Sequence, residues 1–164
     1  MFTEVKKSAV HQLAPSHWEK IRSIVDSGAT VPVMNPATGQ AYPMTAGAAA
    51  KAGVMYQVAT GVEIPNLGEK SMAVMTPEGE IMCYESQCAD VTSTLNAVRS
   101  MIKHKKMVIF DDEGCYVINK ITGTVSNIDD DGINYTMDSY VIPPDQLDDV
   151  MAMTASSSFR GQAR

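Results

Sequence analysis

The sequence has no long apolar run and is short of positive charge. No stretch approaches the roughly 18 consecutive apolar residues that a membrane-spanning helix needs, and residues 1–20 lack the apolar core of a secretory signal peptide. We therefore expect a cytoplasmic or otherwise intracellular protein with no membrane partner. Thirteen Lys and Arg residues stand against 19 Asp and Glu residues, so the formal net charge is -6. Because a nucleic-acid interface needs a basic face, this balance also argues against a nucleic-acid partner.

Cysteine and histidine are scarce as well, which limits metal chemistry. The three cysteines, Cys83, Cys88 and Cys115, are an odd number and cannot all pair within one chain. We expect free thiols, as is usual in a reducing compartment. Cys83 and Cys88 have a spacing that could in principle hold zinc, but no second such pair exists. We expect no bound metal and no cofactor.

The composition is sufficient for one folded domain. Of 164 residues, 45% are apolar and 20% are charged, which allows a real core. Gly and Pro are scattered along the chain, a distribution typical of many short strands and turns. We expect an all-β fold, mostly β with one short helix, over residues 18–142. Residues 1–17 would be an N-terminal extension or an interface strand, and residues 143–164 a flexible tail.

Periodicity and turn residues locate the elements. Residues 20–26 alternate as a strand, with Ile21, Ser23 and Val25 on one face. Four later strand pairs are separated by turn residues. These turns fall at residues 59–61, 77–79, 112–114 and 131–132. Residues 92–106 are the best helix candidate, because apolar residues recur there at helical spacing and Thr92 to Thr94 offer N-caps.

The first strand ends in a motif that has chemical meaning. An apolar run stops at Asp26, and residues 27–29 (Ser-Gly-Ala) follow at once. A carboxylate at the end of a buried strand is costly unless something pairs with it. Asp-Ser-Gly is also ordinary turn chemistry, so the motif alone leaves a structural role open. Asp-Ser-Gly-Ala after an apolar strand nevertheless resembles the active-site turn of aspartic proteases.

Further segments extend this resemblance. They are VDSGAT (25–30), YQVATGVEIPNLGE (56–69), TLNAVRSMI (94–102) and VIFDDEGCYVINKITG (108–123). Over residues 18–140 the chain resembles the retropepsin-like proteases of retroelement polyproteins, in particular those of copia-type retrotransposons. The resemblance implies a closed β-barrel and a homodimeric aspartic protease fold.

The resemblance also implies roles for individual residues. Asp26 would be the catalytic residue, and Ser27 and Gly28 would brace its turn. The implied substrate contacts are Ala29 and Thr30, together with a flap formed by Val58, Ala59, Thr60, Gly61 and Val62. The second motif of the family, two apolar residues and Gly leading into a helix, falls on Leu95, Asn96, Ala97 and Val98. The expected Gly is absent from that place.

The chain holds only one such Asp motif, because Asp138-Ser139 is followed by Tyr140. A protease of this type would therefore be a homodimer with Asp26 from each subunit at a two-fold axis. Two carboxylates about 3 Å apart share one proton, so one accepts a proton from the attacking water while the other protonates the scissile carbonyl. The substrate would be an extended peptide, such as a polyprotein segment, that adds to the site like a strand.

Two alternatives remain open. The first is a catalytically silent retropepsin-like module that dimerises or binds peptides, which the altered second motif favours. The second is a calcium-binding β module, because in residues 127–138 Asn127, Asp129 and Asp131 fall at the first ligand positions of an EF-hand loop. The flanking segments are typical of strands and not of helices, so an acidic hairpin turn is the favoured interpretation of this loop.

Overall fold

The computed structural model of this chain describes residues 17–162, with side chains as far as Thr154, and its dominant structure is β. Within the residues whose side chains are described, strands account for 42% and helices for 15%, so the expectation of a mostly β fold is confirmed. Residues 1–16, most of the expected N-terminal extension, lie outside the described part. No helix within residues 17–162 is long and apolar enough to cross a membrane.

The described elements alternate short strands with three helices. The strands are β1 (Lys20–Asp26), β2 (Val33–Met34), β3 (Met55–Gln57), β4 (Glu63–Pro65), β5 (Gly68–Met75), β6 (Ile81–Cys88), β7 (Thr94–Ala97), β8 (Lys106–Ile109), β9 (Cys115–Asn119), β10 (Val125–Asp130) and β11 (Tyr135–Val141). The helices are α1 (Ala48–Lys51), α2 (Val98–Lys103) and α3 (Leu147–Gln162), and a 3-10 turn, η1 (Pro144–Gln146), precedes α3.

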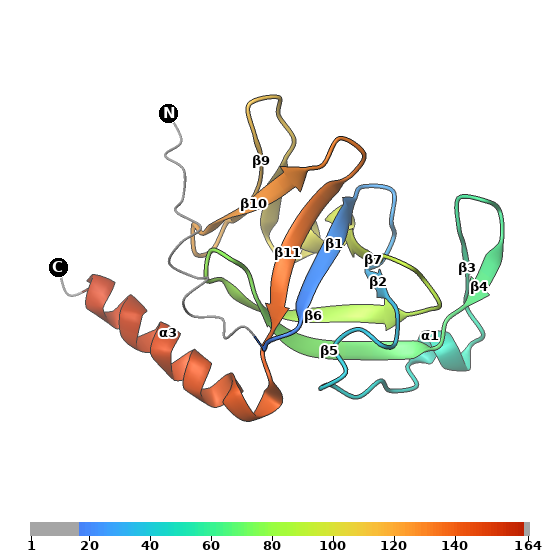
Figure 1. Cartoon of the computed structure of the whole chain (residues 1–164), viewed down its shortest axis with the longest axis horizontal. Coiled ribbons are helices and arrows are strands. Elements are labelled where there is room, and N and C mark those ends of the chain that lie inside the picture. Colours follow the sequence, from blue (N-terminus) through green and yellow to red (C-terminus); the bar gives the residue numbers. More distant parts are fainter. Residues whose placement is uncertain (1–16, 163–164) are drawn as a thin grey trace.

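Six strands close into a barrel (Figure 1). They follow the order β1-β7-β2-β6-β5-β11, and β1 also pairs with β11, which closes the ring. Strands β10, β9 and β8 continue the sheet outward from β11, whereas β3 and β4 form a separate two-stranded sheet. A closed ring leaves no free edge along its six strands, so the edges that remain lie on the β8 side and on the β3–β4 hairpin.

Strand β1 is central to this ring because it pairs on both sides. It runs parallel to β7 and antiparallel to β11. The predicted alternation of β1 is confirmed, since Ile21, Ser23 and Val25 are buried. Ile21 packs in a core cluster inside the barrel, and Val25 packs in a second cluster with residues of β9 and β10 and with α2. The opposite face of β1 is therefore left to face outward.

The predicted strand pairs are confirmed as hairpins. These are β3–β4, β5–β6, β8–β9 and β10–β11, and each turns at the residues that the sequence indicates. In the β5–β6 turn, the N–H of Gly79 donates to the carbonyl of Thr76 at 2.9 Å, and Gly79 has a φ of 90°. This left-handed conformation favours glycine, and the pattern of turn residues therefore carried correct information.

The prediction of a helix over residues 92–106 is largely wrong. Only Val98–Lys103 is helical, and Thr94–Ala97 forms strand β7 instead. Ala97 precedes the helix as its N-cap without a side-chain capping bond, so the threonines do not cap it. Residues 94–97 form a strand because they pair with β1 and bury Thr94 and Ala97 in the barrel. This tertiary contact outweighs the helix propensity of the segment, which is weak in an isolated helix.

The segment from residue 143, predicted to be a flexible tail, is helical within the described residues, so the fold contains more than one helix. The tail forms η1 and the 16-residue helix α3. Leu147 and Val150 pack on a small core cluster that contains Trp18, and Trp18 Nε1 donates to Gln146 Oε1 at 3.1 Å. The helix is stabilised by this contact between distant parts of the chain, which a local pattern does not reveal.

One buried cation organises the loop after β2. Lys70, on β5, is only 3% exposed, and its Nζ donates to the carbonyls of Pro36, Thr38 and Gly39 at 2.9, 2.8 and 3.2 Å. Buried charges require such partners, since an unpaired ammonium group inside a protein is costly. Lys70 thus fixes residues 36–39 to strand β5.

Replacing Lys70 by Met should destabilise the fold. The substitution keeps an apolar stem but leaves three backbone carbonyls without their charged donor, and we expect the free energy of unfolding to fall by about 2–4 kcal/mol. Chemical denaturation would measure this change. The exposed Lys103→Met variant is the matched control and should change stability by less than about 0.5 kcal/mol. An unaltered midpoint for K70M would contradict the structural role of the ammonium group.

Deleting residues 147–164 should expose Trp18, the single tryptophan of the chain. Removal of Leu147 and Val150 uncovers the indole, so its emission maximum should move to longer wavelength. Deleting only residues 155–164 retains both apolar residues and should leave the spectrum of the full chain. Identical spectra from the two truncated proteins would show that α3 does not cover Trp18 in solution.

Candidate active site

The Asp-Ser-Gly turn lies at the carboxyl end of β1. Asp26 is the last residue of the strand and is half-buried, while Ser27 and Gly28 are exposed. The N–H of Gly28 donates to Asp26 Oδ1 at 2.7 Å. A Cβ atom at Gly28 would lie 3.3 Å from the same oxygen, so the absence of a side chain lets this amide approach closely. The turn therefore orients the carboxylate of Asp26 through its own backbone.

The second motif lies directly beside this turn. In the parallel register of β1 and β7, Asp26 is opposite Ala97, and helix α2 begins at the next residue, Val98. Strand β7 lies between β1 and β2 in the sheet, so the loop that joins β1 to β2 has to cross the end of β7. The structure thus brings together two predicted segments that are about 70 residues apart in the sequence.

Ala97 stands at the position where the resemblance leads one to expect Gly. Its exposed fraction is 0%, so its methyl group is accommodated inside the protein at the level of Asp26. Leu95 and Asn96, which precede it, are half-buried. A small side chain is therefore compatible with this packing, and a larger one would have to displace its neighbours.

The predicted flap is a hairpin that stands apart from the barrel. Strands β3 and β4 pair from Met55 opposite Pro65 to Gln57 opposite Glu63. The turn is closed by the N–H of Val58, which donates to the carbonyl of Val62 at 2.9 Å. Residues 59–62 are all exposed. Figure 1 shows the hairpin projecting from one edge of the molecule in the same general direction as the carboxyl end of β1.

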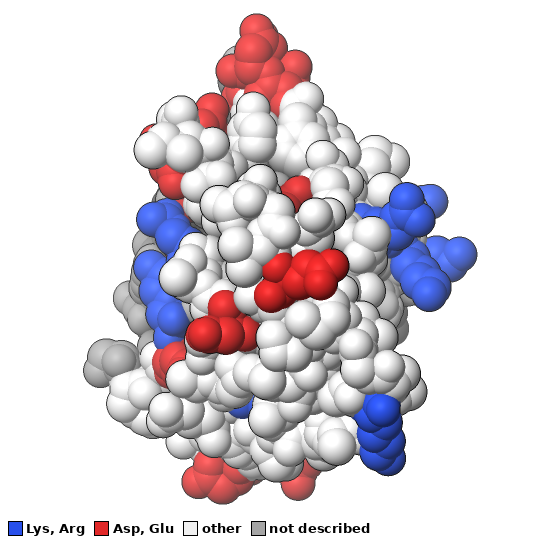
Figure 2. Space-filling view, turned by 90° about the vertical axis from the view of Figure 1, so that its right-hand side faces the viewer, with Lys and Arg blue, Asp and Glu red and all other residues white. Residues whose placement is uncertain are grey.

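The surface on the side of this hairpin carries little charge. Figure 2 shows this side of the molecule, where acidic groups are isolated within a broad uncharged area and basic groups lie toward its margins. Apolar side chains of the hairpin contribute to the exposed surface, with Met55 46% and Val62 58% exposed. A mostly neutral surface with exposed apolar groups is suitable for contact with a polypeptide.

Asn66 fastens the base of the hairpin to the barrel, a role that the sequence did not suggest. Its side-chain nitrogen donates to the hydroxyl of Tyr56 at 2.7 Å and to Gln87 Oε1 at 2.8 Å. Its Oδ1 accepts the N–H of Gly68 at 2.9 Å, and Asn66 is only 7% exposed. One buried amide thus connects β3, β5 and β6. A lone Asn between Pro65 and Leu67 gives no signal of such long-range contacts.

The remaining predicted ligand groups do not assemble into a metal site within residues 17–154. No three His, Cys, Asp or Glu side chains gather there in a way that could hold an ion. Cys83 is exposed, and Cys88 and Cys115 are buried; all three are free thiols. The segment 127–138, which carries the candidate calcium ligands, lies on the β10–β11 hairpin, so strands flank this loop and not the helices that an EF-hand requires.

No family model and no curated protein matches this chain. The geometry of the Asp26 turn, strand β7 and the β3–β4 hairpin therefore carries the functional inference.

Replacing Asn66 by Ala should loosen the hairpin without unfolding the barrel. The variant removes the amide that joins β3 to β5 and β6, so local opening becomes easier. We expect amide hydrogen exchange in residues 55–65 to become about tenfold faster. The exposed Gln57→Ala variant is the control and should exchange at the original rate. Unchanged protection in N66A would mean that strand pairing alone holds the hairpin.

Proposed function

We propose that this chain is a retropepsin-like aspartic endopeptidase that acts as a homodimer on extended peptides, such as segments of a retroelement polyprotein. The observation that carries the proposal is the register of β1 and β7. It places the Asp-Ser-Gly turn next to a small buried residue, Ala97, from which a helix begins. The closed six-stranded barrel and the separate hairpin are consistent with the same proposal.

The homodimer follows from the number of carboxylates that the chemistry needs. The sequence has one Asp-Ser-Gly turn, whereas activation of water by an aspartic dyad requires two such carboxylates. In the proposed dimer, Asp26 of each subunit meets its copy at the two-fold axis, and the two carboxylates share one proton. One member accepts a proton from water while the other donates a proton to the carbonyl oxygen of the scissile bond.

The exposed turn is suited to such a contact. Ser27, Gly28 and Thr30 are exposed in the single chain, so they are available to a second copy without rearrangement of the core. The Ser27 hydroxyl would hydrogen-bond across the axis and hold the two turns in register. The amide of Gly28, which already donates to Asp26, would keep each carboxylate oriented.

The β3–β4 hairpin would cover the substrate. Its tip residue Gly61 has a φ of 85°, and no atom lies within 4 Å of the position that a Cβ atom would take there. The tip is therefore open to an incoming chain. A peptide held between this hairpin and the dyad would form backbone hydrogen bonds like an added strand. Closure over the peptide would exclude water other than the nucleophile.

A second candidate is a dimer that binds peptides without cutting them. Ala97 favours this alternative, because it places a methyl group beside Asp26 where the related proteases have Gly. An additional carbon atom at this point would alter the spacing of the two turns at the axis. Cleavage, and not peptide binding, distinguishes the two candidates.

Asp26→Asn should abolish peptide cleavage while the chain remains dimeric. The amide cannot accept a proton from water, so we expect kcat/KM on a denatured-protein or peptide substrate to fall by roughly 10²–10⁴-fold. The exposed Asp112→Asn variant in the β8–β9 turn serves as the control and should retain full activity. Activity of the unaltered chain should be greatest below neutral pH, since the dyad works with one shared proton.

Two outcomes would contradict the proposal. A chain that remains monomeric in sedimentation at every concentration that supports cleavage could not build the dyad. A D26N variant that cleaves as fast as the unaltered chain would place the chemistry elsewhere. A stable dimer that binds peptides but never cleaves them would favour the second candidate.

A further inference from the structure

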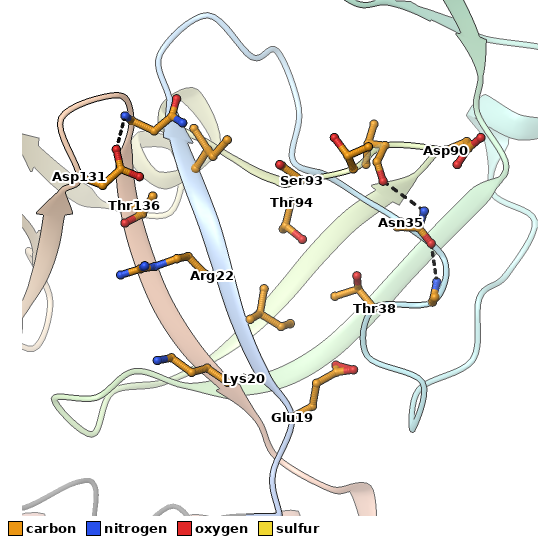
Figure 3. Close-up of a pocket in the computed structure, with 16 residues that line it drawn as sticks. Glu19, Lys20, Arg22, Asn35, Thr38, Asp90, Ser93, Thr94, Asp131 and Thr136 are labelled. Atoms are coloured by element: carbon orange, nitrogen blue, oxygen red, sulfur yellow. Dashed lines mark hydrogen bonds between the residues drawn. The ribbon is translucent and has the colours of Figure 1, made fainter.

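A groove of about 810 Å³ opens beside the outward face of β1 (Figure 3). It is lined by residues of β1, by the segments 35–38 and 90–94, and by the β10–β11 hairpin. Arg22 and Ile24 line it from β1, and Asp26 continues the same face of the strand. With a rise of about 3.3 Å per residue, Ile24 is only about 7 Å from Asp26 along the strand. The groove thus ends close to the proposed catalytic carboxylate without containing it.

The two cations of the groove are already paired. Lys20 Nζ lies 3.5 Å from Asp138 Oδ2. Arg22 lies 3.3 Å from Asp138 Oδ1 through Nε, and 3.7 Å from Asp129 Oδ2 through NH2. These contacts leave the guanidinium and the ammonium groups with carboxylate partners from neighbouring strands. An incoming anion would have to compete with those partners.

Carboxylates outnumber cations around the groove. Asp129 and Asp138 pair with the two cations, and three further acidic residues, Glu19, Asp90 and Asp131, line the groove itself. Five carboxylates against two cations give an excess of three negative charges. The N–H groups of Asn134 and Ile133 donate to Asp131 Oδ1 at 2.6 and 2.8 Å and hold the pKa of this carboxyl below its usual value. Asp131 therefore remains charged at neutral pH.

A buried hydroxyl at the groove lacks a partner. Thr136 lies on β11 opposite Ile24, lines the groove and is only 4% exposed. Its Oγ1 forms no hydrogen bond within the described part of the chain. A buried hydroxyl without a partner costs free energy, and a ligand that supplies one recovers it. Figure 3 shows Thr136 beside Asp131 at one end of the groove, and Arg22 of β1 lies next to Thr136.

We infer that this groove binds a Lys or Arg side chain of the peptide close to the bond that is cut. The inference rests on the proposed function, because it takes the ligand to be an extended peptide. The aliphatic stem would pack against Ile24, and the charged end would donate to Thr136 Oγ1 and Asp131. A carboxylate would meet an excess of negative charge, and an apolar side chain would leave Thr136 without a partner.

Peptide binding to the 164-residue Asp26→Asn chain tests this inference directly. The probes are fluorescein-labelled octapeptides of Ala and Val with one Lys moved through each position, and a matched set with norleucine in place of Lys. We expect one Lys position to bind at least about fivefold more tightly than norleucine, as measured by fluorescence anisotropy.

Variants of the groove identify where the charge is recognised. Asp131→Asn and Thr136→Val, each added to D26N, should reduce the preference for Lys to about twofold or less. Asp112→Asn, added in the same way, is the control and should keep the full preference. Absence of a preferred Lys position would overturn the inference. A preference that persists in both groove variants would also overturn it.

Cleavage by the unaltered chain separates this inference from the proposed function. If the chain cuts the same peptides with no preference for Lys over norleucine, the groove inference is wrong while the protease proposal stands. If D26N shows the Lys preference through Asp131 and Thr136 but the unaltered chain cuts no peptide, the groove inference is supported and the protease proposal is wrong.

Discussion

The pairing of β1 on both of its edges is the constraint on which the rest of the structure depends. Its parallel register with β7 and its antiparallel register with β11 close the barrel. Ile21 and Val25 commit one face of the strand to the two core clusters, so Arg22, Ile24 and Asp26 must face outward. The fold and the candidate site are therefore set by the same contacts. A shift of β1 by one residue would exchange its faces and remove the carboxylate from the surface.

Around this strand, hydrogen bonds from backbone and side-chain groups hold the loops in place. The amide of Gly28 orients Asp26, Asn66 connects the hairpin to β5 and β6, and Lys70 binds the carbonyls of the loop after β2. Each of these groups supplies hydrogen bonds to backbone or side-chain polar atoms that would otherwise lack a partner. The β3–β4 hairpin is different, because strand pairing and the Asn66 base are its main attachments. The carboxylate turn is therefore fixed by its own backbone, and the β3–β4 hairpin has fewer attachments to the barrel.

The sequence predicted those parts of the fold that depend on local chemistry. Turn residues located four hairpins, and the alternation of residues 20–26 identified both the strand and its buried face. The prediction of a helix over residues 92–106 was wrong because β7 is stabilised by pairing with β1, a distant contact that the spacing of apolar residues does not indicate. The helix α3 was missed because its anchor, Trp18, lies about 130 residues earlier in the sequence. The same limit applies to the site: Asp26 was visible as a motif, whereas Asn66 and Thr136 matter through contacts with distant strands.

The contact between Trp18 and α3 also fixes where the polypeptide enters and leaves the barrel. Both events occur at the amino end of β1, and the six steps from Lys20 to Asp26 span about 20 Å to the opposite end. Sequence joined to the barrel through either point would start on the far side from Asp26. In the proposed protease, a bond near such a junction would need a long tether to reach the Asp26 carboxylate of its own subunit.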